Sequence, residues 1–389
     1  MSVIDERLKE FATATQSRYI DAINKYGSGA KAAVALGIHK AGLNRAIAAV
    51  RRKAALHGYA PDFGMHKVAP APFVVRGTST LYDDLGNQKL QWVKTKLDDE
   101  QVERAMRAAI EALAEDVVRA KPAAAPKANA DHLLTLYTLT DCHVGMRSWK
   151  PEAGEDWDLA IAERVLTGAF QQLIGSTPKA GTAFVSQLGD FLHYDSLNAV
   201  TPLHGNLLDA DGRYEKVVRV AVRILRVIID AALRKHQKVV VLMAEGNHDM
   251  ASSVWLRHLF SLLYENEPRV EVIDSPLPYY SYQHGETMLA FHHGHLSKNE
   301  QLPGIFAAQF PRLWGNTTRR YCHTGHRHHV KEQEDGGMIV IQHPTMAARD
   351  SFAARGGMIA DRTMTAITYH EKHGQVGRVT VTPEMLAGA

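Results

Sequence analysis

Strand-like and helix-like patterns alternate along residues 132–264, and this alternation is the feature that most constrains the fold. Three apolar segments of strand length stand at 132–140, 181–189 and 238–246, and the amphipathic helix patterns 158–174 and 214–235 separate them. A third helix pattern, SSVWLRHLFSLLY, follows at 252–264. Strands that alternate with helices of this length pack as a sheet with helices against it. The sequence therefore predicts an α/β layered domain.

From about residue 270 onward the patterns are mainly those of strands. They are VEVID (270–274), YYSYQHGETMLAFHHG (279–294), RRYCHTG (319–325), MIVIQ (338–342), MTAITYH (364–370) and GRVTVT (377–382). Consecutive strands joined by short turns favour antiparallel pairing. We expect these segments to form a second, more antiparallel sheet.

Metal-ligand residue types gather where the predicted strands end. The carboxyl ends of the strands in an α/β sheet lie at one edge, where the loops converge, so we expect these clusters to meet. A mononuclear site needs three or four protein ligands, and the larger number here suits two ions. The candidate ligands are Asp141, His143, Asp190, Asn247, His293, His326 and His328.

The order of these motifs resembles that of the calcineurin-like metallophosphoesterase superfamily. In this chain the motifs read DCH (141–143), GD (189–190), GNHD (246–249), HG (293–294) and GHRH (325–328), so the resemblance covers roughly residues 132–345. It implies a layered β-sandwich flanked by helices. It also implies that Asp141, His143 and His328 hold one metal ion. Asn247, His293 and His326 would hold the other, with Asp190 bridging the two ions.

The resemblance also implies the chemistry. Two divalent ions would activate a shared water to hydrolyse a phosphoester, with His248 as proton donor or transition-state stabiliser. Asp249 is expected to orient His248 or to cap the next helix, and His193 completes the candidate catalytic residues. Imidazole and carboxylate ligands do not decide the metal, so we expect manganese first, with magnesium, iron, zinc or nickel as alternatives.

The segment GDFLHYD narrows the substrate class by resemblance. It departs from the GDxxDRG pattern of Ser/Thr protein phosphatases, because His193 takes the place of the later aspartate and no Arg-Gly follows. It is more similar to the GDxxH or GDxxD of SbcD-type DNA nucleases. We therefore expect a phosphodiesterase that acts as a DNA nuclease. Two alternatives stay open: an enzyme acting on small nucleotides or phosphoprotein, and a DNA-binding regulator with a vestigial catalytic domain.

The N-terminal segment has the features of a DNA-binding helix-turn-helix. Ala33, Gly37 and Leu43 fit the small, turning and apolar positions of that motif. Residues 18–60 hold eight Lys/Arg against the single acid Asp21, a surplus that suits contact with a phosphate backbone, although a helical packing or oligomerisation module is the alternative. The candidate DNA contacts are Lys40, Arg45, Arg51, Arg52 and Lys53. This arrangement resembles phage-borne metallophosphoesterases with an N-terminal helix-turn-helix.

The boundary between the two parts is expected at KPAAAPKANA (121–130), which reads as a linker. Residues 1–120 then form a small α+β domain that includes a hairpin over 73–97, a possible wing, and a helix over 98–120. Residues 131–389 form the metallophosphoesterase domain. Arg349 and Arg355 follow the last metal motif, and we expect them to bind the substrate phosphate.

The composition of the sequence indicates the cellular compartment. Two cysteines, Cys142 and Cys322, give no disulfide framework, which indicates a reducing cytoplasm. The sequence contains neither a signal-peptide pattern nor an apolar run of membrane-spanning length. We expect a cytoplasmic protein with DNA as its partner, without a membrane partner, and with homo-oligomerisation open.

Overall fold

The computed structural model describes residues 4–66, 73–82, 88–97, 119–126, 130–202 and 205–386. The chain divides into two compact units, residues 1–109 and 110–389, and each is described by itself. The expected hairpin turn at 83–87 lies outside the described residues, as does the expected helix over 98–120 except for its last two residues. Those two residues and the first part of the expected linker belong to the second unit, where the amide of Ala123 donates to Glu267 Oε2 at 2.7 Å.

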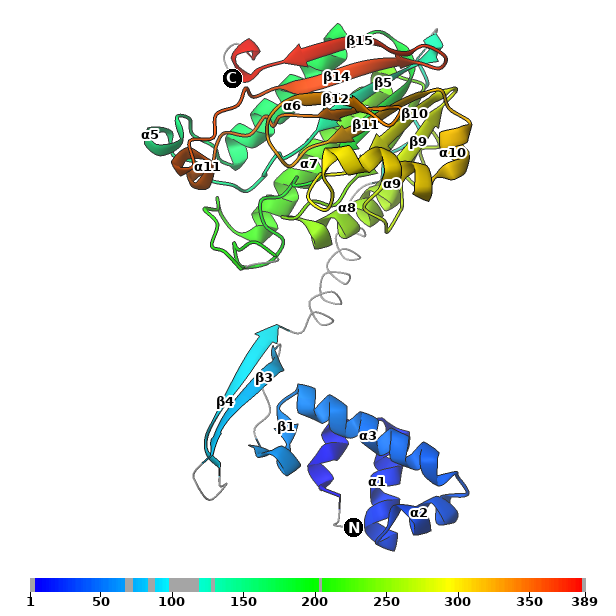
Figure 1. Cartoon of the computed structure of the whole chain (residues 1–389), viewed down its shortest axis with the longest axis vertical. Helices are drawn as coiled ribbons and strands as arrows, with labels where there is room; N and C mark the ends of the chain where they lie inside the picture. Colours follow the sequence, from blue (N-terminus) through cyan, green and yellow to red (C-terminus); the bar gives the residue numbers. More distant parts are fainter. Residues whose placement is uncertain are drawn as a thin grey trace. The chain divides into compact units, whose positions relative to one another are not determined.

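The first unit is a small helical bundle followed by a two-stranded ribbon (Figure 1). The core of the bundle consists of apolar side chains from all three α-helices, among them Ile20, Ala33 and Leu43. The elements are η1 (Glu6–Phe11), α1 (Ala14–Tyr26), α2 (Gly29–Leu36), α3 (Lys40–Leu56), β1 (Tyr59–Ala60), η2 (Pro61–Phe63), β2 (Met65–His66), β3 (Phe73–Tyr82) and β4 (Gln88–Leu97).

A tight turn at Gly37 joins α2 to α3. Gly37 has a φ of 66°, a left-handed conformation that glycine adopts without steric cost, and its amide closes α2. Ala33 and Leu43, on the two sides of this turn, are both buried. The three positions that the sequence singled out therefore set how α2 and α3 pack.

The second unit is a sandwich of two β-sheets with helices on both outer faces (Figure 1). Its strands are β5 (Ala130–Leu139), β6 (Ala180–Gln187), β7 (Lys238–Met243), β8 (Val270–Val272), β9 (Tyr280–His284), β10 (Thr287–Phe291), β11 (Arg319–Thr324), β12 (Lys331–Asp335), β13 (Met338–Gln342), β14 (Met364–His370) and β15 (Gly374–Val381). Its helices are α5 (Lys150–Ala153), α6 (Leu159–Ser176), α7 (Tyr214–Lys235), α8 (Met250–Leu263), α9 (Leu302–Gln309), α10 (Pro311–Gly315) and α11 (Ser351–Arg355), with short 3-10 turns η3 (Asn299–Gln301) and η4 (Pro383–Met385).

The first sheet has the strand order β15-β14-β5-β6-β7-β8. Strands β5 to β8 are parallel, and β14 and β15 add to this sheet antiparallel to their neighbours. The predicted strands and helices between residues 132 and 264 are all confirmed, within a few residues at their ends.

The second sheet has the order β12-β13-β11-β10-β9 and differs from the expectation in two ways. Its three central strands, β10, β11 and β13, are parallel, and antiparallel pairs occur at its two edges. The expected members 270–274, 364–370 and 377–382 belong to the first sheet instead. The prediction was wrong here because apolar alternation identifies a strand but carries no information about its partner.

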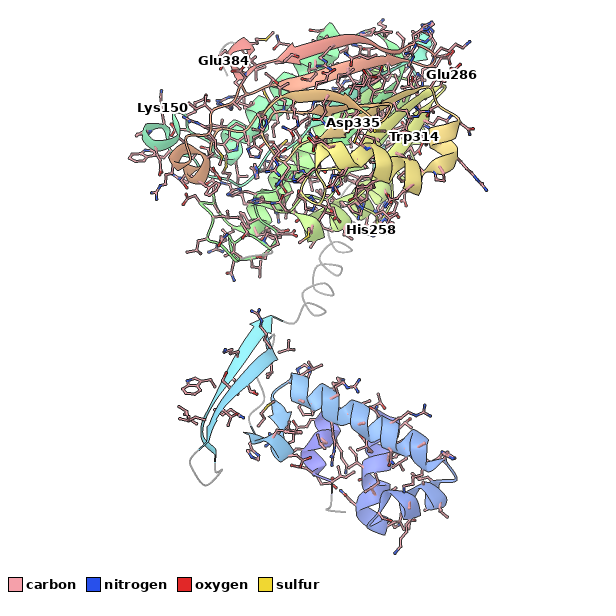
Figure 2. The ribbon with its side chains drawn as sticks, viewed as in Figure 1. Lys150, His258, Glu286, Trp314, Asp335 and Glu384 are labelled. Atoms are coloured by element: carbon pink, nitrogen blue, oxygen red, sulfur yellow. The ribbon has the colours of Figure 1, made fainter. Side chains whose placement is uncertain are left out.

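Large apolar side chains from both sheets meet in the middle of the sandwich. Phe184 of β6 and Phe291 of β10 stack with their ring centroids 4.6 Å apart. On the outer face of the second sheet, Leu302 and Phe306 of α9 cover β10, β11 and β13. Trp314 of α10 lies at the end of the same layer, where the guanidinium of Arg320 stacks on its ring (Figure 2). The shared core between the sheets, which includes Phe184 and Phe291, holds them face to face and so brings their strand ends together.

In the part of the chain that the structure describes, no helix combines the length and the apolar character that a membrane span requires.

Two glycines of the first unit provide a matched test of its geometry. A Cβ atom at Gly37 or at Gly42 would meet no atom within 4 Å, but Gly37 has a positive φ and Gly42 lies within α3. We expect Gly37→Ala to destabilise the unit by about 1–2 kcal/mol, since an L-residue resists the left-handed conformation. Gly42→Ala should stabilise it by up to about 1 kcal/mol, since alanine favours the helix. Calorimetric unfolding of the full chain measures the stability of both variants. Stability changes of the same sign in the two variants would contradict the left-handed turn assigned to Gly37.

Candidate metal centre

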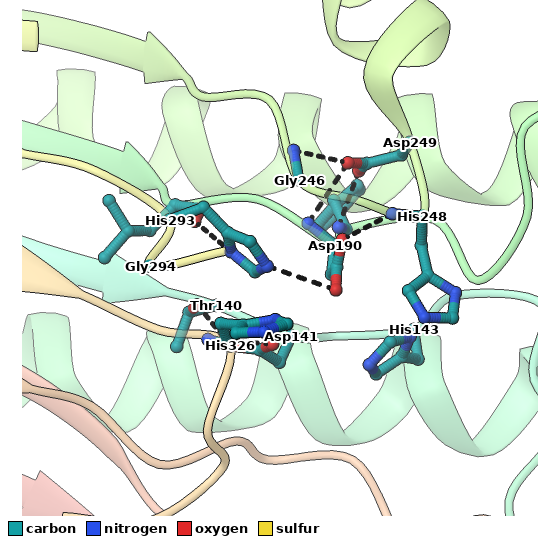
Figure 3. A network of polar contacts seen from close by, with 12 residues as sticks. Thr140, Asp141, His143, Asp190, Gly246, His248, Asp249, His293, Gly294 and His326 are labelled. Carbon is teal, nitrogen blue, oxygen red and sulfur yellow. Dashed lines mark hydrogen bonds and ion pairs between the residues drawn. The ribbon is translucent and has the colours of Figure 1, made fainter. Parts of the chain in front are cut away.

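The predicted ligands come from the carboxyl ends of strands in both sheets. Asp141 and His143 follow β5, Asp190 follows β6, and Asn247 follows β7 of the first sheet. His293 follows β10 and the pair His326 and His328 follows β11 of the second sheet. Because the sheets are packed face to face, their strand ends form one edge, and Figure 3 shows side chains from both sheets directed toward one another there.

Five of the candidate ligands have a left-handed backbone. Among the described residues, the non-glycine positions with positive φ are Asp141, His143, Asp190, His326 and His328, with φ between 44° and 67°. This conformation costs about 1–2 kcal/mol for an L-residue, and such strain gathers at functional sites. The same five positions were singled out from the sequence, so strain and motif agree on the site.

Two glycines let the loops approach the carboxylates. A Cβ atom at Gly246 would lie 2.1 Å from Asp190 Oδ1, and one at Gly325 would lie 2.5 Å from Asp141 Oδ2. Any larger residue at either position would displace a carboxylate. The glycines of the GNHD and GHRH motifs are therefore required by close packing at the site.

The first group of ligand atoms belongs to Asp141, His143 and His328, and its atoms lie within 4.8 Å of one another. His328 Nε2 is 3.1 Å from Asp141 Oδ1 and 3.4 Å from His143 Nε2. Asp141 is fully buried and is held by the hydroxyl of Thr140, which donates to Oδ2 at 2.6 Å. Two imidazoles and one carboxylate in this arrangement can hold a divalent ion.

The second group consists of Asp190, His293 and His326, again within 4.8 Å. His293 Nδ1 lies 2.9 Å from the carbonyl of Leu188, which can only accept a hydrogen bond, so Nδ1 carries the proton and Nε2 is free to bind a metal. His293 Nε2 lies 3.2 Å from Asp190 Oδ2. Asn247 Oδ1 is buried without a hydrogen-bond partner, as a ligand oxygen would be.

The charges at this edge also fit a cation. Burial lowers the pKa of His293, but Asp190 and Asp141 outweigh burial and raise it to about 10. Burial alone would raise the pKa of Asp190, but His293 opposes it and holds that pKa well below its usual range. The two carboxylates therefore favour positive charge between them, whether a proton or a divalent ion supplies it.

Asp249 has a different role from either one expected. It stands directly before α8, but its carboxylate makes no cap to that helix. It accepts instead from the backbone amides of Asp190, Phe191 and Leu192, and from that of Gly246, at 2.7–3.1 Å (Figure 3). Burial, with Asp190 and Asp195 nearby, raises the pKa of Asp249 to about 8, and these amide donors oppose the rise. Asp249 thus fixes the loop that carries Asp190.

His248 contacts both the ligand loop and His193. Its backbone amide donates to Asp190 Oδ1 at 2.8 Å, and its Nδ1 lies 2.8 Å from the carbonyl of His193. His193 Nδ1 lies 3.2 Å from Nδ1 of the candidate ligand His143, and the rings of His193 and His248 stack with their centroids 5.6 Å apart. Burial lowers the pKa of His193 to about 3 and keeps this imidazole neutral.

Sequence reasoning missed two supporting residues. Asp195 caps α8 by accepting from the amides of Ala251 and Ser252 at 2.6 and 2.8 Å, the role that was expected of Asp249. The hydroxyl of Thr345 donates to the carbonyl of Asp141 at 2.6 Å. Asp195 is the last residue of GDFLHYD, and an aspartate near the start of a helix is a signal for a cap. No local pattern predicts the contact of Thr345 with Asp141.

Arg349 and Arg355 have partners other than the one expected. Arg349 donates to the carbonyl of Ala153 at 3.0 Å, and Arg355 pairs with Glu152 at 3.3 Å. Both arginines tie α11 and its flanks to α5. The structure therefore does not place either of them as a phosphate clamp.

Comparisons with known proteins give distant structural likenesses. No family model matches the chain, and no curated protein matches it. A predicted phosphoesterase from Streptococcus pneumoniae is 10% identical with a TM-score of 0.29, over 65% of this chain and 91% of that one. A zinc-complexed Vps29 from Entamoeba histolytica is 15% identical with a TM-score of 0.27, over 64% and 99%. An archaeal phosphodiesterase is 12% identical with a TM-score of 0.30, over 64% and 99%.

The hydrogen bonds of Asp249 give a prediction. Asp249→Asn places an amide group against backbone donors, so we expect a loss of about 2–4 kcal/mol in the free energy of unfolding. Asp195→Asn is the comparison, because the Asp195 carboxylate accepts from two backbone amides rather than four, and the loss should be about half as large. Urea unfolding of the full chain measures both. Equal losses would contradict the role assigned to Asp249.

Proposed function

We propose that this protein is a metal-dependent phosphodiesterase of the calcineurin-like superfamily that hydrolyses DNA. The observation that carries the proposal is the clustering of candidate ligands at this edge, together with the buried, unpartnered oxygen of Asn247. Besides the two groups described above, His143, His193 and His248 form a third group that shares His143 with the first. Mixed imidazole, carboxylate and amide ligands suit a divalent transition metal, and manganese is our first choice.

The chain's own residues supply the rest of the chemistry. Bound to these groups, two divalent cations would activate water for attack on phosphorus and neutralise charge on the phosphoryl oxygens. His248 is the proton donor to the leaving oxygen. Its Nδ1 is committed to the carbonyl of His193, so the proton that it transfers must come from Nε2. His193 keeps His143 in one ring orientation through the contact between their Nδ1 atoms.

The first unit supports DNA as the substrate. Its eight Lys/Arg between residues 18 and 60 are all exposed, five of them on α3, and the acid within this range is Asp21. Exposed cations on a helix that follows a glycine turn suit contact with the phosphate backbone. The five on α3 are Lys40, Arg45, Arg51, Arg52 and Lys53, and Arg51 also lies 3.4 Å from Asp62 in an exposed pair.

A substrate panel tests the function. With added manganese, we expect the full chain to hydrolyse linear duplex DNA, single-stranded DNA and bis-p-nitrophenyl phosphate, because the first two are phosphodiesters of DNA and the third is a minimal diester. Activity on p-nitrophenyl phosphate should be much weaker. Activity confined to that monoester would contradict the nuclease and favour the alternative of a phosphatase.

A second prediction concerns His248. His248→Ala should slow turnover of DNA by roughly 10²–10⁴-fold, the usual contribution of a positioned acid, while the bound metal stays unchanged. The loss should be smaller on bis-p-nitrophenyl phosphate, because p-nitrophenolate leaves without a proton. Steady-state kinetics and metal analysis of the same sample measure this. An equal loss on both substrates would exclude the proton-donor role.

A further inference from the structure

The ribbon β3–β4 carries exposed apolar side chains that the proposed function does not use. Trp92 is 53% exposed, and Leu81 and Leu90 are 50% and 49% exposed. Among the residues that the structure describes, the two strands pair only with each other (Figure 1). A two-stranded ribbon is only marginally stable in water, so apolar surface displayed on it indicates a binding role.

The strand register places these side chains on one face. Ser79 lies opposite Trp92, and Leu81 lies opposite Leu90. Residues directly opposite, and residues two apart along a strand, share a face of a sheet. Gln91 is on the other face, where its side chain donates to Thr80 Oγ1 at 3.1 Å and to the carbonyl of Phe63 at 3.4 Å. The contact of the ribbon with Phe63 is therefore made from the face opposite to Trp92.

The neighbours of Trp92 leave its indole open and make its surroundings positive. Small residues stand across from it, and a Cβ atom at Gly77 would meet no atom within 4 Å. Lys94 lies opposite Gly77, and both Lys94 and Arg76 are exposed. The ribbon side chains that the structure describes, at 74–81 and 90–94, include no acid.

We propose that this face is a stacking platform for unpaired nucleobases of a single-stranded nucleic acid. Tryptophan stacks on bases of any sequence, and Lys94, two residues further along the strand on the same face, contacts the phosphates between them. The two leucines extend the apolar floor next to the indole. A second copy of the ribbon fits less well, because face-to-face pairing would bring cations of like sign together. The inference rests on the proposed function, in which nucleic acid is the substrate, and adds that unpaired strand is held by the first unit.

The test is binding of fluorescein-labelled oligothymidylate of about 20 nucleotides, longer than the site of one such module, to the full chain. EDTA prevents hydrolysis during the titration. Trp92→Ala should weaken this binding by about 5- to 100-fold, and Trp92→Phe, which keeps a ring, should retain most of the affinity. Val93→Ala is the matched control, since Val93 is similarly exposed on the opposite face, and it should bind like the wild type. Affinity for a duplex of the same length should not change in any variant.

Unchanged binding of oligothymidylate by Trp92→Ala would overturn the platform, and so would an equal loss on the duplex. A loss accompanied by a change of mass in light scattering would overturn it in favour of self-association. If the wild type binds duplex but not the single strand, the platform fails and the proposed nuclease stands. If the wild type binds neither the single strand nor the duplex, the platform fails together with the DNA specificity of the proposed function.

Discussion

The buried carboxylates of Asp141 and Asp190 are the constraint on which the rest of the second unit depends. Both are excluded from solvent, and a buried charge is tolerated only where it is paired and hydrogen-bonded. Backbone amides, the imidazoles of His293 and His328 and the hydroxyl of Thr140 surround them. Loops from both sheets must reach one edge to provide these partners. The packing of the two sheets, the strained backbone of the ligands and the glycines beside the carboxylates all serve this requirement.

The sequence predicted that the candidate ligands would meet, because each follows a strand and the loops after strands converge at one edge. Five of the seven positions then proved to have a left-handed backbone, which no spacing rule foresaw. The helix-capping role predicted for Asp249 was wrong, because its carboxylate accepts from backbone amides 57–59 residues earlier in the chain. Local patterns favour a cap at that position, and only the fold shows that Asp195 provides it.

Strand pairing shows the same limit. The segments at 364–370 and 377–382 were recognised as strands but assigned to the wrong sheet. Their alternation fits any sheet with one covered face. The first of them pairs with β5, which begins more than 200 residues earlier, and the second pairs with the first. The prediction that Arg349 and Arg355 bind the substrate phosphate failed for a related reason. Closeness in sequence to the last metal motif does not determine where a long side chain finds its partner, and here the partners lie in and beside α5.

We propose that Asp190 joins two metal positions into one reactive centre. Crystals of the full chain grown with manganese would test it directly through an anomalous difference map. The account predicts two peaks, one in contact with Asp141, His143 and His328, the other with Asn247, His293 and His326, and Asp190 touching both. A single peak, or two peaks with Asp190 bound to one of them alone, would contradict it.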